Sequence, residues 1–435
     1  MNFHESESYL LSLGNEVETM KLGLDNIRTL LDALGNPQNN YLKVQVAGTN
    51  GKGSVCAFLD SICFEAGIPT GLYTSPHLVS ITERIKIGGK DVSEKEFARL
   101  ATIVRETSES LVANGKLERV PTYFEQVTAM ALQAFADAKV ELAILETGLG
   151  GRFDATTAAN AEIAAITRID LDHQEYLGET IEEIAAEKAA IITQQTQYVI
   201  LGEQSHDVMH ILWKRCSDLG IDPLNDEHAP WRILKTDNAK VDVHLHLIIF
   251  PPIHLGLLGT HQFENAQTAI QIVRALGLIE LFPYDEEGES FVIKGLENAR
   301  HPGRLEYAGR FLFDGAHNIA GARALREYLD EFVTQPITMI FAAMKDKEIA
   351  EIGEILFPKA ETLILTRPEN SRAIDPAEIL AQMPDGIDLN KVVVTQTVKD
   401  AIAQASNLAR DNGLILVTGS LYLIGEVKRI LSSQI

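Results

Sequence analysis

The fold is decided by the stretch KVQVAGTNGKGS, residues 43–54. Residues 43–47 form a short, mostly apolar run that predicts a β-strand, and Gly48 to Ser54 form a glycine-rich turn. Apolar residues then recur at helical spacing, at positions 55, 58, 59, 62 and 66. We therefore expect a strand, a turn and a helix that begins immediately after Ser54, which is the first part of a βαβ unit.

Further strands continue this alternation along the chain. They are predicted at Thr70–Thr74, Leu142–Glu146, Ile163–Thr167 and Tyr198–Leu201. Val241–Leu247 alternates apolar with polar residues, and Pro251-Pro252 follows, so this stretch predicts a small antiparallel appendage.

A second α/β series follows the break at Pro302-Gly303. Its strands are predicted at Arg310–Phe313, Ile337–Ala342, Glu361–Leu365, Lys391–Thr395 and Leu414–Thr418, with helices such as Ile319–Phe332 and Leu421–Leu431. The prediction is an α/β protein with two domains. Residues 1–297 form a P-loop-type, mostly parallel sheet with the appendage, and residues 298–435 form a Rossmann-like domain.

Composition and charge narrow the class of protein. The chain has 435 residues with 38 Lys and Arg against 61 Asp and Glu, a formal charge of −23, which argues against nucleic acid or anionic membranes as general partners. Its three cysteines include no CxxC pair, so neither a disulfide framework nor a zinc knuckle is expected. No signal sequence or long apolar segment is visible, and we expect a cytoplasmic location.

The glycine-rich turn has the chemistry of a phosphate loop. Glycines let backbone N–H groups surround a phosphate, Lys52 supplies a positive charge, and Ser54 can reach Mg²⁺. The spacing departs from the common G-x-x-x-x-G-K-[ST] pattern, because Val46 stands five positions before Gly51 and Gly53 separates Lys52 from Ser54. The alternative is a flexible strand-to-helix turn without a ligand.

Polar residues follow three other predicted strands. Ser75 comes after the second strand, Glu146 ends the third beside a glycine-rich turn, and His173 follows the fourth. Each has a plain alternative, namely a turn cap, a surface carboxylate and a structural histidine. Because parallel strands end at one edge of a sheet, the residues together predict a nucleotide–Mg²⁺ site.

Three further places carry candidate residues. Lys188 lies in the helical stretch Ile184–Ile192, Arg304 follows Pro302-Gly303, and Asp314 and His317 stand at the end of the predicted strand Arg310–Phe313. A cation from a second domain can complete a phosphoryl-transfer site. The alternatives are an ordinary helix surface for Lys188, a salt-bridged arginine and a helix-capping aspartate.

Taken together, these stretches resemble the Mur ligase superfamily, and within it the folylpolyglutamate synthases and dihydrofolate synthases. The matching stretches are GTNGKGS (48–54), TSPHL (74–78), ERI (83–85), ETGLGGRFDAT (146–156), LDHQEYLG (171–178), EKAAII (187–192), GTHQFENA (259–266), HPGRLE (301–306), DGAHN (314–318) and VTGSLYLIGEV (417–427). They occur in the family's order and extend from about residue 20 to residue 428. The combination is specific, although each piece alone is not.

The resemblance implies roles for individual residues. ATP would be bound by Asn50, Gly51, Lys52, Gly53, Ser54, Asn265, Arg304 and Asp314, with His317 beside them. Ser75 and Glu146 would hold one Mg²⁺, and His173 a second. Lys188 looks like the lysine that family members carry as a carbamate, and a monovalent cation such as K⁺ is also implied. The residues expected in catalysis are Lys52, Lys188, His173, Arg304 and His317.

The pterin side of the site is implied by two further stretches. They supply Thr122, Phe124, Glu125, Phe153, Asp154 and Ala155. The sequence departs from the family pattern at three places. The family's KAG reads Lys188-Ala189-Ala190 here, its DATN reads DATT (residues 154–157), and His301 stands where an aromatic residue often precedes PGR. None of these removes a residue assigned to phosphate or metal.

The implied reaction is an ATP-driven ligation of L-glutamate to dihydropteroate or a reduced folate, through an acyl phosphate. The partners would be small molecules only, with neither nucleic acid nor membrane, and the protein would be a monomer. Three alternatives stay open: a cell-wall amino-acid ligase with a UDP-muramoyl substrate, a non-enzymatic nucleotide-binding protein, and a simple P-loop kinase. The choice between dihydropteroate and reduced folate is open too.

Overall fold

The computed structural model describes residues 1–14, 23–224, 231–235, 240–245, 248–249, 253–283 and 285–432. The chain forms two compact units. The first consists of Met1–His77, Ile81–Gly256 and Phe263–Arg300, and the second of Leu78–Ser80, Leu257–Gln262 and His301–Ile435. No helix in these described ranges is both long and apolar enough to cross a membrane.

The first unit is built on a seven-stranded sheet in the order β4-β3-β2-β5-β1-β6-β7. Its strands are β1 (Leu42–Ala47), β2 (Thr70–Tyr73), β3 (Ile85–Ile87), β4 (Lys90–Asp91), β5 (Leu142–Glu146), β6 (Ile163–Ile166) and β7 (Tyr198–Leu201). The five predicted strands pair in parallel, and β3 and β4 add an antiparallel edge that was not predicted. Because β1 is the middle strand of the five that pair in parallel (β2-β5-β1-β6-β7), the turn after it lies at the middle of their carboxyl edge.

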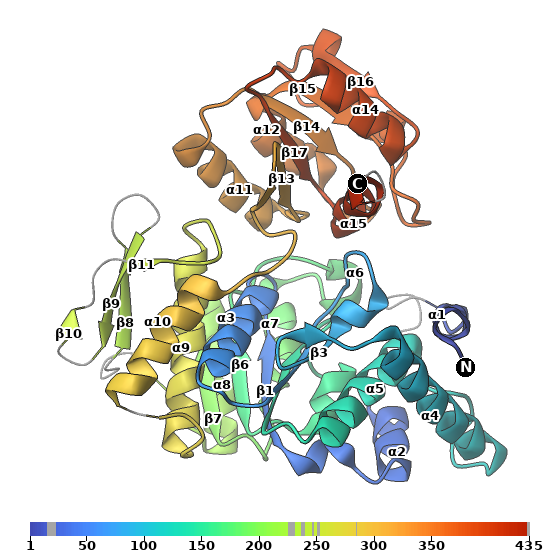
Figure 1. The fold of residues 1–435 in the computed structure, drawn as a ribbon, viewed down its shortest axis with the longest axis vertical. Coiled ribbons are helices and arrows are strands. Elements are labelled where there is room, and N and C mark those ends of the chain that lie inside the picture. The colour runs from blue at the N-terminus through green and yellow to red at the C-terminus, as the bar shows by residue number, and fades with distance from the viewer. Residues whose placement is uncertain are drawn as a thin grey trace. The chain divides into compact units, whose positions relative to one another are not determined.

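Helices cover the sheet of the first unit. They are α1 (Phe3–Ser12), α2 (Asp25–Ala33), α3 (Lys52–Glu65), α4 (Glu94–Ala113), α5 (Tyr123–Ala138), α6 (Gln174–Leu177), α7 (Ile181–Ala189), α8 (His206–Leu219), α9 (Gln262–Leu278) and α10 (Glu286–Asn298), with short 3₁₀ helices η1 (Pro37–Asn40), η2 (Ile81–Arg84) and η3 (Ala155–Ala159). Helix α10 packs against α3 (Figure 1). Gly295 makes this close approach possible, since a Cβ there would lie 2.4 Å from the Ile62 Cα.

The predicted appendage is present as a separate antiparallel sheet. Its strands are β8 (Trp231–Lys235), β9 (Lys240–Leu245), β10 (Ile248–Ile249) and β11 (Ile253–His254), and β9 pairs with the other three. The predicted strand Val241–Leu247 is confirmed as far as Leu245. His246 and Leu247 at its end, and the Pro251-Pro252 pair, lie outside the described residues.

The second unit is built on a six-stranded sheet in the order β12-β13-β17-β14-β15-β16. The strands are β12 (Glu306–Ala308), β13 (Phe311–Asp314), β14 (Ile337–Phe341), β15 (Ala360–Leu365), β16 (Val392–Val394) and β17 (Leu414–Thr418), of which only the edge strand β12 is antiparallel. The helices are α11 (Ile319–Phe332), α12 (Ile349–Leu356), α13 (Pro376–Leu380), α14 (Val398–Leu408) and α15 (Leu421–Ser432), with the 3₁₀ helices η4 (Phe357–Lys359) and η5 (Leu389–Lys391).

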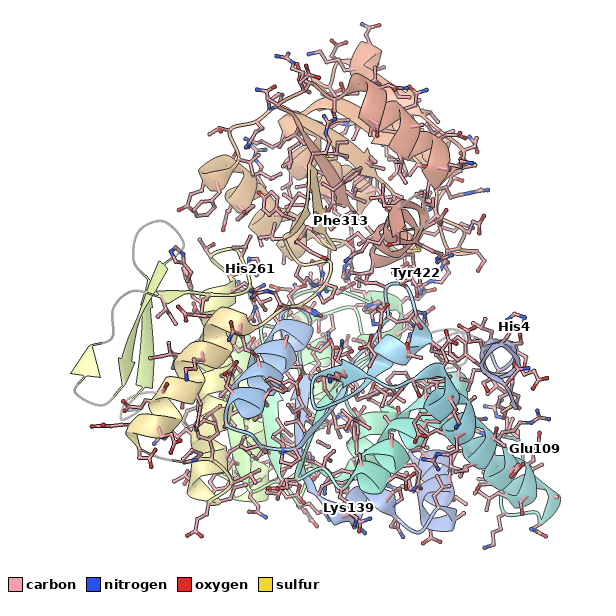
Figure 2. The ribbon with its side chains drawn as sticks, in the orientation of Figure 1. His4, Glu109, Lys139, His261, Phe313 and Tyr422 are labelled. Atoms are coloured by element: carbon pink, nitrogen blue, oxygen red, sulfur yellow. The ribbon has the colours of Figure 1, made fainter. Side chains whose placement is uncertain are left out.

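Helices bury both faces of this second sheet. One core contains the apolar side of α11 and α12, and the other contains α14 and α15 together with Phe313, which Figure 2 labels. A mostly parallel sheet with helices on both faces is a doubly wound α/β domain. The predicted fold class, with a mostly parallel first sheet, an antiparallel appendage and a Rossmann-like second domain, is therefore confirmed.

One local prediction is wrong. Helix α3 begins at Lys52 and not after Ser54, because Gly51 adopts the left-handed conformation (φ 90°) that lets the chain turn directly into the helix. Lys52, Gly53 and Ser54 therefore form the first helical turn, where backbone N–H groups have no partner within the helix.

Candidate active site

The turn after β1 is held closely by its neighbours in the first unit. A Cβ on Gly48 would lie 1.9 Å from Thr167 Oγ1, and a Cβ on Gly51 would lie 2.2 Å from Asn265 Oδ1. Thr167 Oγ1 also donates to Asn50 O at 2.7 Å. The turn is thus fixed between the end of β6 and the start of α9, and it leads directly into the N-terminus of α3. This is the geometry that binds phosphate in open α/β sheets.

Two lysines donate to one carbonyl oxygen in this turn. Lys52 Nζ donates to Gly48 O at 3.0 Å and to Thr49 O at 3.1 Å, and Lys188 Nζ donates to Gly48 O at 2.9 Å. Lys188, near the end of α7, is only 4% exposed. Its burial, and then the positive charge of Lys52, lower the pKa of Lys188 to about 7. A large share of Lys188 is therefore the neutral amine at neutral pH.

Ser75 and Glu146 lie together at the ends of β2 and β5. The backbone N–H of Ser75 donates to Glu146 Oε2 at 3.1 Å, and Glu146 is 6% exposed. The two residues follow adjacent parallel strands, so the register of the sheet brings them together. The contact is made by the Ser75 backbone, so it places the residue next to the carboxylate, and a serine hydroxyl and a carboxylate are both hard oxygen donors of the kind that Mg²⁺ prefers.

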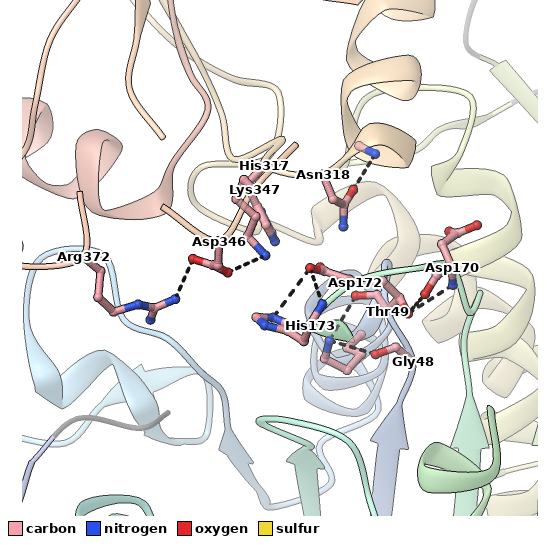
Figure 3. A network of polar contacts seen from close by, with 12 residues as sticks. Gly48, Thr49, Asp170, Asp172, His173, His317, Asn318, Asp346, Lys347 and Arg372 are labelled. Carbon is pink, nitrogen blue, oxygen red and sulfur yellow. Dashed lines mark hydrogen bonds and ion pairs between the residues drawn. The ribbon is translucent and has the colours of Figure 1, made fainter. Parts of the chain in front are cut away.

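The segment after β6 returns to the same turn (Figure 3). Thr49 Oγ1 donates to Asp170 O at 2.9 Å, and Asn50 Nδ2 donates to Asp170 Oδ2 at 3.2 Å. His173 adopts a left-handed conformation (φ 53°) at the start of α6, and its backbone N–H donates to Asp172 Oδ1 at 2.9 Å. Asp170 and Asp172 thus order the loop that carries His173.

These residues fit a lightly coordinated magnesium ion. Within the described ranges, no group of three or more His, Cys, Asp or Glu side chains is arranged to hold a metal. Mg²⁺ is usually held by one or two carboxylates and completes its coordination with phosphate oxygens and water. The pair of Ser75 and Glu146 suits that requirement.

Two of the residues predicted on the pterin side have a local structural role. Thr122 and Glu125 form the capping box of α5, in which Thr122 N donates to Glu125 Oε2 at 2.7 Å and Glu125 N donates to Thr122 Oγ1 at 3.4 Å. This cap fixes the start of the helix that carries Phe124. A Cβ on Gly148 would lie 2.5 Å from Phe124 Cζ, so the loop after β5 packs directly on that ring.

The loop from Gly148 to Ala155 is closed by Asp154. Its Oδ2 accepts from Gly148 N and Leu149 N, both at 2.9 Å, and its Oδ1 accepts from Thr156 N at 3.0 Å and Thr156 Oγ1 at 2.5 Å. Burial raises the pKa of Asp154, while these hydrogen bonds oppose the rise. Phe153 and Ala155 flank this carboxylate, and the contact of Gly148 with Phe124 brings the two predicted pterin stretches together.

In the second unit, Asp314 closes another loop. Its Oδ2 accepts from Leu305 N and its Oδ1 from Ala316 N, both at 3.0 Å. A Cβ on Gly315 would lie 2.6 Å from Arg304 Nη1, and His317 Nδ1 lies 2.7 Å from Gly315 O. Burial raises the pKa of Asp314, and the charge of Arg304 opposes the rise. Arg304, Asp314 and His317 thus gather at the carboxyl end of β13.

One residue of the first unit was missed by the sequence analysis. Gln45 lies inside β1 between Val44 and Val46, is completely buried, and donates to threonines of the loop after β5 and of η3. The signal was present, since an amide in an otherwise apolar central strand needs a hydrogen-bonding reason. The sequence alone does not show where its partners lie.

The chain matches known families and structures along most of its length. Residues 46–273 match the family described as Mur ligase middle domain, and residues 303–421 match the family described as Mur ligase, glutamate ligase domain. The dihydrofolate synthase/folylpolyglutamate synthase of Mycobacterium tuberculosis is 33% identical over 447 residues, which cover 94% of this chain and 89% of the relative.

Two other comparisons complete this set. A probable bifunctional folylpolyglutamate synthase/dihydropteroate synthase of Haloferax volcanii is 32% identical over 98% of this chain, and the chain spans about half of that relative's length (50%). A solved structure, Mycobacterium tuberculosis folylpolyglutamate synthase complexed with ADP, superposes with a TM-score of 0.90 at 30% identity, with 98% of each chain covered.

Proposed function

The chain belongs to the Mur ligase family, among the dihydrofolate synthases and folylpolyglutamate synthases, and from this premise we propose that it is an ATP-dependent ligase that adds L-glutamate to a pteroate or folate carboxylate. One observation carries the proposal. Lys52 and Lys188 converge on Gly48 O at the tip of the central strand, while Ser75 and Glu146 meet at the ends of the neighbouring strands. A phosphate loop beside a hard-oxygen pair suits phosphoryl transfer.

ATP is the proposed energy source. The similar Mycobacterium tuberculosis structure is complexed with ADP, which supports the binding of an adenine nucleotide by this chain. We assign the phosphates to Asn50, Gly51, Lys52, Gly53 and Ser54, because these residues form the glycine-rich turn and the first turn of α3, where backbone N–H groups have no partner within the helix. Asn265, which contacts Gly51, is the proposed contact on the adenine side. Arg304, Asp314 and His317 are the proposed nucleotide contacts of the second unit.

Mg²⁺ is the proposed metal, held by Ser75 and Glu146, with a second ion near His173. When bound, it would neutralise phosphate charge and align the phosphoryl group. Lys188 would assist as a carbamate: its neutral amine adds to CO₂ and releases one proton, which turns the neutral side chain into an anionic carbamate. The lowered pKa of Lys188, about 7, keeps the reactive neutral amine available.

The reaction would proceed in two steps. The acceptor carboxylate attacks the γ-phosphorus, which forms an acyl phosphate and releases ADP. The amine of L-glutamate then attacks the acyl carbon, the tetrahedral intermediate expels inorganic phosphate, and an amide forms. Lys52 would balance the charge on the transferred phosphoryl group. Phe124, Phe153 and Ala155 would face the pterin, while Thr122, Glu125 and Asp154 shape the segments that carry them.

Several finer points belong to this proposal. We propose that the protein acts as a cytoplasmic monomer on small molecules, with no nucleic-acid or membrane partner, and that a monovalent cation such as K⁺ activates it. The name of the Mycobacterium tuberculosis relative includes both activities, which supports a test with both acceptors.

The test is phosphate release from MgATP and L-glutamate with dihydropteroate, tetrahydrofolate or no acceptor. We expect acceptor-dependent release that Lys52→Ala abolishes. Release with both acceptors establishes two activities, and release with one assigns the protein to that activity. Release only with a UDP-muramoyl acceptor, or with none of these acceptors, contradicts the proposal.

A further inference from the structure

Gln45 lies inside β1, and its side-chain amide contacts three threonines that follow β5. Its Nε2 lies 2.8 Å from Thr157 Oγ1, 2.9 Å from Thr156 Oγ1 and 3.2 Å from Thr147 Oγ1. Thr147 directly follows Glu146, and the other two threonines belong to η3, directly after Asp154. Gln45 is 0% exposed, so these contacts are shielded from water.

The direction of two of these hydrogen bonds follows from the other hydrogen bonds that Thr156 and Thr157 make. Thr156 Oγ1 donates to Asp154 Oδ1 at 2.5 Å, and Thr157 Oγ1 donates to Gly151 O at 2.8 Å. Each hydroxyl has one proton, so both can only accept from Gln45. The two N–H groups of the Gln45 amide supply the two protons that these hydroxyls accept. If the amide oxygen stood in place of Nε2, neither hydroxyl would have a proton left to donate to it. The network therefore runs outward from Gln45 along two branches.

Both branches end on the backbone that shapes the loop. The branch through Thr156 ends on Asp154, which gathers Gly148 N and Leu149 N. The branch through Thr157 ends on Gly151, which lies against the last turn of α7. There a Cβ on Gly151 would be 2.7 Å from Glu187 O, and Arg152 N donates to Glu187 O at 3.0 Å. Through the first branch, Gln45 thus supports the hydrogen bonds within the loop. Through the second, it supports the contact between the loop and α7, the helix that carries Lys188.

This arrangement has a cost in stability. Gln45 Oε1 is buried and has no hydrogen-bond partner among the residues that the structure describes. A buried polar atom without a hydrogen-bond partner lowers the stability of the folded state, and an apolar side chain would avoid this cost. Since an apolar residue would serve the strand at least as well, the amide is explained by what it positions.

We propose that Gln45 is a positioning residue for the acceptor: through Thr156 and Thr157 it sets the place of the loop that carries Phe153 and Ala155. The inference rests on the proposed function, because it takes this loop to face a pteroate or folate. It also accounts for the DATT sequence of this chain. Thr157 supplies the hydroxyl that passes the hydrogen bond from Gln45 to Gly151.

The test compares two disrupting variants with two matched controls in the full-length protein. Gln45→Met keeps the side-chain length without the amide, and Thr157→Val keeps the shape without the hydroxyl. Lys43→Met changes the opposite end of β1, where Lys43 Nζ donates to Gln38 O and Glu162, and Thr157→Ser retains the hydroxyl. Steady-state KM values for dihydropteroate, tetrahydrofolate and MgATP are measured with the melting temperature of each variant.

We expect Gln45→Met and Thr157→Val to raise the acceptor KM at least fivefold while the MgATP KM changes less than twofold. Gln45→Met should melt within a few degrees of the wild type, because it also removes the unsatisfied oxygen. Lys43→Met should lower the melting temperature without raising the acceptor KM, and Thr157→Ser should behave like the wild type.

The outcomes separate the two proposals. A wild-type protein without acceptor-dependent turnover overturns the proposed function, and this inference with it. An active wild type whose acceptor KM is unchanged in both disrupting variants overturns the role of Gln45 alone. An equal rise in the acceptor and MgATP KM values also overturns it, because a general loss of structure would give that result.

Discussion

Asp154 in the first unit and Asp314 in the second close their loops in the same way but in different surroundings. Each buried carboxylate accepts backbone N–H groups through both oxygens, Asp154 within one loop and Asp314 from Ala316 in the loop after β13 and from Leu305 before β12. Asp154 is backed by a hydroxyl and an amide, and its hydrogen bonds are what favour its charged form. Asp314 has the charge of Arg304 beside it.

The two aspartates illustrate two ways of fixing a loop, one by neutral hydrogen bonds and one by a neighbouring positive charge. A neutral network such as that behind Asp154 depends on direction, since each donor must meet its acceptor. A charge pair such as Arg304 and Asp314 tolerates small shifts but depends on the charge itself. We therefore expect substitutions in the first loop to act mainly on shape and stability, and substitutions in the second to act mainly on charge-dependent binding and on pH dependence.

The largest effect is expected for Asp154→Ala. It leaves the buried donors of Gly148, Leu149 and Thr156 without their acceptor, which should lower the free energy of unfolding by about 3 kcal/mol. The acceptor KM should rise more than tenfold. Urea unfolding and steady-state kinetics measure both. Asp32→Ala, at an exposed position of α2, is the control. A loss of stability as small as that of the control would show that Asp154 does not close the loop.

The second prediction concerns pH and the charge of Arg304. Burial and that charge lower the pKa of His261 in the second unit to about 4, whereas an unfolded histidine titrates near 6.5. The unfolded chain binds the proton first, so stability is lost as the pH falls from about 6.5 to about 4, by up to about 3 kcal/mol.

His261→Gln should remove this part of the acid sensitivity. The free energy of unfolding, measured between pH 7 and pH 4.5, should fall less steeply in the variant than in the wild type. Parallel curves for the two proteins would mean that His261, which Figure 2 labels, is already accessible to protons in the folded state.

The third prediction tests the charge pair directly. Asp314→Asn keeps the shape of the side chain but removes the charge beside Arg304, so we expect a rise of about fivefold in the MgATP KM, or about 1 kcal/mol, with little change in the acceptor KM. Asp330→Asn is the control, because Asp330 is an exposed partner of Lys359 and Arg326 on α11. A rise in the acceptor KM alone would contradict the distinction between the two loops.

The smallest effect is expected for Arg152→Ala. Arg152 Nε pairs with Glu187 Oε1 at 2.7 Å, but the side chains are 47% and 26% exposed, and such pairs contribute less than about 1 kcal/mol. The interior network should hold the loop without this pair, so both KM values should stay within twofold of the wild type. A large rise in the acceptor KM would show that the surface pair, and not Gln45, fixes the loop.

Much of the fold follows from local patterns. The strands Leu142–Glu146, Tyr198–Leu201 and Leu414–Thr418 and the helix Ile319–Phe332 agree with their predicted ends. The strands β3, β4 and β12 were missed. They have only two or three residues, too few to show a period, and unlike the equally short β16 they are not continuous apolar runs. The start of α3 was misplaced because the left-handed conformation of Gly51 lets the helix begin at Lys52, which the spacing of apolar residues does not show.

The candidate site divides in the same way. Lys52, Ser75, Glu146 and His173 were found because parallel strands end at one edge, so their positions in the sequence imply their neighbourhood. Thr122 and Glu125 were predicted as pterin contacts, and the structure adds their capping box. The direct roles of all these residues stay predictions. Gln45 was missed because its partners are threonines more than 100 positions further along the chain.

The order of most strands and helices, the glycine-rich turn after β1 and the family follow from the sequence alone, since these depend on short patterns and on motifs that keep their order. Three features appear only in the folded chain: Lys188 shares Gly48 O with Lys52, Asp154 and Asp314 each gather backbone N–H groups, and Gln45 contacts three threonines. The physical reason is that hydrogen bonds and pKa shifts depend on distances of a few ångströms and on burial, and both arise only when distant segments pack together.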